Sequence, residues 1–187
     1  MTGQPTWERA TSWRQGHVLD VKAATSLSLL HAVTPAETCV VVISHDCDLA
    51  NDDLTTEPDV ELIVGRVVAE AKGTLAWGKS PRTLHLEMLR DGKTVTVELV
   101  ATSKQLVAKI KLSSYSREPA FELSAQGLGV LRNWLSIRYN RGAFSDPFIE
   151  RMKDKTKIIT RESTGLRFQI GKTRIPQRAR PASSEFF

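Results

Sequence analysis

The chain has 187 residues, of which 41% are hydrophobic and 25% are charged, and it carries a formal net charge of +5. These proportions are ordinary for a globular protein, and no run approaches the ~18 consecutive apolar residues that a membrane-spanning helix needs. The length suits one domain with an extension, because two full domains would be cramped in it. The charge is uneven, because residues 1–99 hold 9 Lys+Arg against 14 Asp+Glu, whereas residues 100–187 hold 17 against 7.

The amino-terminal segment is polar, and we expect residues 1–12 to form a flexible arm whose single aromatic side chain, Trp7, packs against the body. It lacks the basic and then apolar order of a secretory signal, so we expect a cytoplasmic protein. The two cysteines, Cys39 and Cys47, lie near opposite ends of one expected strand. At roughly 3.3 Å per residue they are too far apart for a disulfide, and we expect free thiols.

Several segments before residue 111 have the β-branched content and alternation of strands. These are residues 13–21, 39–43, 60–68, 83–89, 93–100 and 106–110, the last of which also allows the start of a helix. Asp91-Gly92 is the strongest hairpin signal in the chain, and it joins the fourth and fifth of these segments. Residues 34–37, 51–59 and 70–81 are expected to be turns or loops.

The apolar run Cys39–Ile43 is the strongest strand prediction, and it is apolar on both faces. Because strand side chains alternate, Cys39, Val41 and Ile43 should share one face and Val40 and Val42 the other. We therefore expect this strand to lie inside the sheet with both faces covered.

The best candidate site follows this run directly. Ser44, His45, Asp46, Cys47 and Asp48 place a hydroxyl, an imidazole, two carboxylates and a thiol within five positions. If the strand continues through them, Asp46 and Asp48 lie together and Cys47 lies apart, which favours an acidic pair over a cysteine nucleophile. We take Asp46, Asp48, His45 and Cys47 as candidate catalytic residues of a nuclease-like hydrolase.

A metal site is a second hypothesis for the same cluster, although its ligands are unknown and no cofactor is required. Asp46 and Asp48 could hold a divalent ion such as Mg²⁺ through water, or His17, His31 or His85 could complete a ligand set. No paired Cys or His spacing accompanies them. The structural alternative, in which the aspartates cap the following turn, is slightly favoured.

Beyond residue 122 the apolar period changes from two to 3.6. Residues 123–139 predict a helix with Leu128, Leu131, Leu135 and Tyr139 on one stripe and Trp134 in the core. A second helix is expected from Ser145 to Lys157, followed by strands at 158–160 and 166–170 and a basic tail.

The basic side chains of this half are expected to contact phosphate groups, with aromatic residues interleaved among them. The candidate nucleic-acid-binding residues are Arg132, Arg138, Arg141, Arg151, Lys153, Lys155, Lys157, Arg174, Arg178 and Arg180. Because a basic surface also binds acidic proteins, the alternative to nucleic-acid binding is a protein–protein interaction module.

Three segments in order, Gly16–Leu19, Val40–Ser44 and Val60–Val64, resemble the opening strands of PemK/MazF-like toxin barrels. The resemblance implies a small SH3-like barrel that cleaves RNA without metal, usually as a dimer. Gly65-Arg66 stands where that family has a hydroxyl residue, so its catalytic pair is not carried over to this chain. The Ser-His-Asp-Cys-Asp segment also resembles one found in uncharacterised prokaryotic proteins.

We therefore predict an α+β protein with a small, strongly bent β-barrel or sheet (SH3-like by the resemblance) followed by a basic helical hairpin. The expected parts are a flexible arm (1–12), a barrel-like core (13–115), a helical hairpin with late strands (116–170) and a basic tail (171–187). The predicted function is a bacterial toxin–antitoxin or defence-type protein that binds RNA or DNA. A doubly wound α/β fold is the rival architecture.

Overall fold

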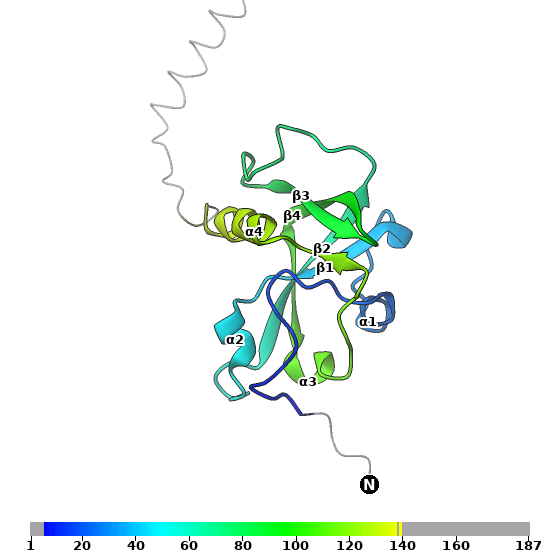
Figure 1. The fold of residues 1–187 in the computed structure, drawn as a ribbon. Helices are drawn as coiled ribbons and strands as arrows, with labels where there is room; N and C mark the ends of the chain where they lie inside the picture. Colours follow the sequence, from blue (N-terminus) through cyan, green and yellow to red (C-terminus); the bar gives the residue numbers. More distant parts are fainter. Residues whose placement is uncertain (1–5, 138, 140–187) are drawn as a thin grey trace, which may run out of the picture. The chain divides into compact units, whose positions relative to one another are not determined.

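The framework of the fold is a curled, five-stranded antiparallel sheet of half-barrel form with the order β1-β2-β4-β3-β5 (Figure 1). The computed structural model describes residues 6–137 and 139, which fall within one unit of the chain. The strands are β1 (Thr38–Val42), β2 (Asp59–Val68), β3 (Thr83–Arg90), β4 (Lys93–Ala108) and β5 (Phe121–Glu122). The prediction of an α+β protein with a bent sheet is confirmed, and the doubly wound alternative is wrong, because every pair of these strands is antiparallel.

Within residues 6–137, the helical segments are short except for the one nearest the carboxyl terminus. They are α1 (Val21–Ser26), the 3₁₀ turn η1 (Pro35–Glu37), α2 (Asp46–Ala50), α3 (Lys109–Leu112) and α4 (Ala125–Ile137). The helix predicted over 123–139 is confirmed as α4. Among the described residues, no helix is long and apolar enough to cross a membrane. The second helix predicted from Ser145 to Lys157, the strands at 158–160 and 166–170 and the basic tail lie outside the described residues.

The β3–β4 hairpin forms as predicted around Asp91-Gly92, with Arg90 opposite Lys93. Asp91 and Gly92 have φ values of 50° and 74°, the left-handed pair that a two-residue type I′ turn requires. The separate strand predicted at 106–110 does not form, whereas the alternative that a helix begins there is confirmed from Lys109. Instead, β4 continues without interruption to Ala108, because its last residues pair with the start of β2, and α3 follows immediately.

The first predicted strand, residues 13–21, is reduced to two single bridges, Val18 with Val41 and Leu19 with Arg117. It stops there because the Asp20 carboxylate accepts a hydrogen bond from the Ala23 N–H (2.6 Å) and begins α1. The short segment nevertheless covers the outer edge of β1: the Gly16 N–H donates to the Val42 carbonyl (2.8 Å), and the Leu19 N–H donates to the Val40 carbonyl (2.9 Å). The prediction that β1 lies inside the sheet is therefore wrong, because β1 is a terminal strand of the sheet, although the segment before it covers its outer edge.

Two apolar clusters lie on opposite faces of β1, as the alternation predicted. Cys39, Val41 and Ile43 belong to one cluster, which α4 covers with Leu131 and Trp134. Val40 and Val42 belong to the other cluster, which the amino-terminal segment, α1, α2 and α3 cover with the side chains of Trp7, Trp13, Ala23, Ala24, Leu49 and Leu112. Both predictions, that Trp7 packs against the body and that Trp134 is core, are confirmed.

Candidate functional site

The predicted catalytic cluster forms the turn between β1 and α2. The β1 ladder ends at Val42, and the Ser44 hydroxyl, which is buried, accepts a hydrogen bond from the Glu61 N–H (2.8 Å). His45 is the N-cap of α2, and its Nδ1 accepts a hydrogen bond from the Cys47 N–H (3.3 Å). The hypothesis that the strand continues through the cluster is therefore wrong, because a cap and two acidic residues in the first turn favour a helix there.

The helical geometry separates the two candidate carboxylates. Asp46 and Asp48 are two residues apart on α2, which turns their side chains by about 200° relative to each other. The Asp46 carboxylate accepts hydrogen bonds from the Gln15 N–H (2.8 Å) and from the Arg132 guanidinium (3.3 Å). Asp48 instead lines a hollow on another side of the helix. The two groups do not form the acidic pair that an extended strand would have made.

Gln15 and Arg132 were not linked to this cluster by the sequence, yet they complete its polar contacts. Arg132 Nε donates to the Gln15 side-chain oxygen (2.7 Å), and the Gln15 side-chain nitrogen, Nε2, donates to the Ile43 carbonyl (2.8 Å). Gln15 is buried, whereas Arg132 and Asp46 are partly exposed. The network joins the amino-terminal segment, the β1–α2 turn and α4, so Asp46 and Arg132 both hold elements together.

A buried lysine holds the other end of α2. The Lys109 ammonium donates to the carbonyls of Asp48 (2.6 Å) and Asn51 (2.9 Å), and it lies 5.8 Å from the centre of the Trp7 ring. Cations are favourable at a helix carboxyl terminus, where carbonyls lack partners in the helix. Burial lowers the pKa of Lys109, and the neighbouring carboxylates, Glu57 foremost, oppose that effect.

The two thiols differ in their exposure to solvent, and neither forms a disulfide, as predicted. Cys39 lies in the core, where burial raises its pKa to about 12. Cys47 is exposed, and its contact with His45 is made by its backbone N–H and not by its sulfur. The structure therefore shows no contact through which His45 would activate the Cys47 thiol as a nucleophile.

A hollow of about 490 Å³ lies beside the turn. Three residues of the cluster, Ser44, His45 and Asp48, line it. Its ionisable lining is mostly acidic and consists of His45, Asp48, Glu57, Asp59, Glu61, Lys104 and Tyr139. Lys104 lies 4.0 Å from the Glu61 carboxylate and 3.3 Å from the Tyr139 hydroxyl. Within the part of the chain that the structure describes, no group of three or more His, Cys, Asp or Glu side chains has the geometry to hold a metal ion.

The acidic loop after α2 has an internal structural role. The Asp53 carboxylate accepts hydrogen bonds from the hydroxyls of Thr55 (2.6 Å) and Thr56 (2.8 Å), which lower its pKa to about 2. The turn is thus capped by Asp53 and not by Asp46 or Asp48, for which the sequence favoured this role; the Asp46 carboxylate binds Gln15 and Arg132 instead.

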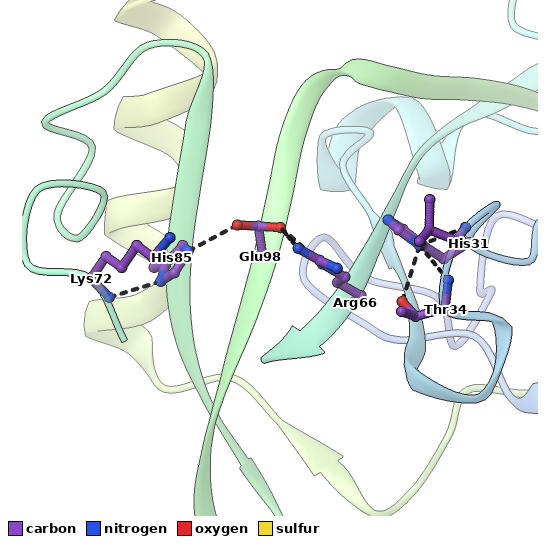
Figure 2. Close-up of polar contacts among 7 residues, drawn as sticks. His31, Thr34, Arg66, Lys72, His85 and Glu98 are labelled. Carbon is purple, nitrogen blue, oxygen red and sulfur yellow. Dashed lines mark hydrogen bonds and ion pairs between the residues drawn. The ribbon is translucent and has the colours of Figure 1, made fainter. Parts of the chain in front are cut away.

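A second polar network, which the sequence analysis did not predict, crosses the sheet from β2 to β3 (Figure 2). Glu98 of β4 lies between Arg66 of β2 (2.8 Å) and His85 of β3 (3.2 Å). Burial acts to raise the pKa of Glu98, but hydrogen bonds from His85 and Arg66 outweigh burial and lower it. Because His85 and Glu98 are equally distant from the Asp91-Gly92 turn, the hairpin register alone would have placed them opposite each other.

All four histidines of the chain use Nδ1 to accept a hydrogen bond from a main-chain N–H. The donors are Arg14 for His17 (3.2 Å), Thr34 for His31 (3.2 Å), Cys47 for His45 (3.3 Å) and Lys72 for His85 (3.0 Å). Figure 2 shows the contacts of His31 and His85. The acceptor role places the proton of the His85 ring on Nε2, which faces Glu98. The imidazoles that were considered as metal ligands thus have local structural partners.

Of the candidate nucleic-acid-binding residues, the structure describes Arg132. Arg138, Arg141, Arg151, Lys153, Lys155, Lys157, Arg174, Arg178 and Arg180 lie outside the described residues. The described residues carry 14 Lys+Arg against 16 Asp+Glu, a net of −2, whereas residues 138 and 140–187 carry 12 against 5, a net of +7. The positive charge of the protein therefore comes from the carboxyl-terminal segment, and the described body is slightly acidic.

Comparisons with protein-family models, curated proteins and solved structures found no match to this chain.

Proposed function

We propose that this protein binds RNA or DNA through its basic carboxyl-terminal half, as a cytoplasmic bacterial protein of the toxin–antitoxin or defence type. The observation that carries the proposal is the charge division, with a net of +7 over residues 138 and 140–187 beside a body of net −2. Lysine and arginine clusters bind phosphate backbones by releasing counterions. The class of protein, and an SH3-like form of the bent sheet, rest on the resemblance to PemK/MazF-like barrels.

Filter binding of RNA and DNA across a series of salt concentrations tests the proposal. For the wild type, we expect affinity to fall steeply with salt, and the triple variant Lys153→Gln, Lys155→Gln, Lys157→Gln should lower the slope by about 2 to 3, at about 0.7–0.9 per lost phosphate contact. The matched control replaces three exposed lysines of the body, Lys22, Lys93 and Lys111, by glutamine and should keep the wild-type slope.

Absence of binding at low salt, or equal slopes for both triple variants, would refute the proposal. In the first case, purified protein free of nucleic acid, with a low 260/280 nm absorbance ratio, would point to a protein partner for the basic segment.

A second candidate function is a hydrolase whose site is the hollow beside α2, since Ser44, His45 and Asp48 all line it. Asp48→Asn changes a carboxylate that faces the hollow and leaves the carbonyl that Lys109 binds. If the hollow cleaves RNA or DNA, this variant loses cleavage while Cys47→Ser keeps it, and added chelator shows whether a metal takes part. Full cleavage activity in Asp48→Asn would place the activity elsewhere.

A further inference from the structure

Trp77 differs from the other tryptophans of the chain. Trp7, Trp13 and Trp134 are buried at 6%, 3% and 1% exposure, whereas Trp77 is 56% exposed. It lies in the loop between β2 and β3, and its φ of 58° is in the left-handed region that bulky residues rarely adopt. Such backbone strain persists only where the surroundings hold it, and it is concentrated at binding sites.

The loop that carries Trp77 is fixed to the body by hydrogen bonds on both sides of this residue. The Lys72 N–H donates to the buried His85 ring (3.0 Å), and the His85 N–H donates to the Leu75 carbonyl (3.0 Å). On the other side, the buried Trp134 ring donates to the Ser80 carbonyl (2.9 Å). The exposed indole is thus presented by an anchored loop, which reduces the entropy lost when a ligand binds to it.

The surroundings of Trp77 suit a polyanion with flat rings. Residues 69–82 carry Lys72, Lys79 and Arg82 against Glu70, a net of +2, while the other described residues sum to −4. Beside the indole is a cavity of about 60 Å³, and its polar lining consists of His85, Glu87, Ser124 and Gln126. Because this cavity is small and the indole beside it is 56% exposed, we place a flat ring on the indole face.

We propose that Trp77 is a stacking platform for an unpaired base of RNA or DNA, with the basic loop contacting the adjoining phosphates. The inference rests on the proposed function and names the form of nucleic acid that is bound, namely a single strand. An exposed indole stacks on any base, and each such contact is worth about 1–3 kcal/mol, which is a factor of about 5 to 150 in affinity. In a duplex the bases are already stacked and cannot reach it.

The test combines tryptophan emission with filter binding, using a short oligouridylate, a short oligothymidylate and a duplex of the same length. Since three of the four tryptophans are buried, quenching of the solvent-exposed emission reports Trp77. We expect both single strands to quench the wild type. Trp77→Ala should weaken single-strand binding about 5- to 150-fold and leave duplex binding unchanged, and Trp77→Phe should restore most of the affinity.

Val33→Ala, at another exposed apolar side chain of the body, is the matched control and should bind like the wild type. Circular dichroism and thermal unfolding establish that each variant is folded. Wild-type binding without quenching, or equal affinities of wild type and Trp77→Ala, would overturn the stacking role and leave the proposed function standing. A wild type that binds none of the three probes would overturn both.

Discussion

At the scale of single residues, the histidines illustrate how a side chain with catalytic potential is committed to structure. His17 is half-buried, its ring lies 6.4 Å from the Trp13 ring, and its Nδ1 accepts the Arg14 N–H. Burial lowers the pKa of His17 from its ordinary value of 6.5, and the charges of Arg117 and Arg14 lower it further, against a smaller opposing effect of Asp46. The folded protein thus favours the neutral ring.

This lowered pKa predicts a pH dependence of stability. As the pH falls below about 6.5, the unfolded chain binds a proton at His17 that the folded chain does not bind, so the free energy of unfolding decreases. Above that range both states are neutral and the effect is absent. We expect His17→Gln to lose less stability than the wild type between about pH 7.5 and pH 5.5, as measured by urea unfolding at each pH. Parallel curves for the two proteins would contradict this prediction.

At the scale of elements, the pairing of β2 with β4 depends on the absence of a side chain at one position. Gly65 lies where the register of the two strands shifts. A Cβ atom there would lie 2.6 Å from the Glu98 carbonyl oxygen and 2.6 Å from a methyl group of Leu99. The backbone oxygen cannot move aside without disturbing the ladder, so the close approach requires glycine.

Gly65→Ala should therefore destabilise the protein by about 1–3 kcal/mol or more, since overpacking forces the two strands apart. Gly73→Ala is the matched control, because a Cβ at Gly73 meets no atom within 4 Å. We expect that variant to stay within about 0.5 kcal/mol of the wild type. Urea unfolding of the three proteins measures the difference, and equal midpoints would show that the strands adapt to the added methyl group.

At the scale of the whole molecule, β1 lies between the two apolar clusters and belongs to both. Neither face of the strand can be exposed unless the elements that cover it move away. Its outer edge is also bonded to the amino-terminal segment. Opening of β1 should consequently require unfolding of the described body as a unit.

Thiol labelling tests this directly. In native buffer a disulfide reagent should modify Cys47, which is exposed, while Cys39, with its pKa of about 12, stays unmodified. In Cys47→Ser, labelling of Cys39 should accelerate with urea in proportion to the globally unfolded fraction. Rapid labelling of Cys39 without denaturant would indicate local opening of β1 and contradict the prediction.

The sequence by itself determined the elements whose signals are local. The β3–β4 hairpin follows from Asp91-Gly92, because few other residues adopt two successive positive φ values. Helix α4 follows from its apolar period, and the two covered faces of β1 follow from a run in which every residue is apolar. In each case neighbouring residues along the chain carry the whole preference.

Only the tertiary structure decided which groups the polar cluster after β1 contacts. Local signals for a capped helix compete with the strand at His45, and distant groups stabilise the helix: Lys109 binds its terminal carbonyls, and Arg132 and Gln15 bind Asp46. These partners lie between 31 and 86 residues away from the groups they bind, so no local pattern reveals them. From the sequence, Lys109 is expected at the surface. Only the fold shows that its ammonium is buried and binds main-chain carbonyls.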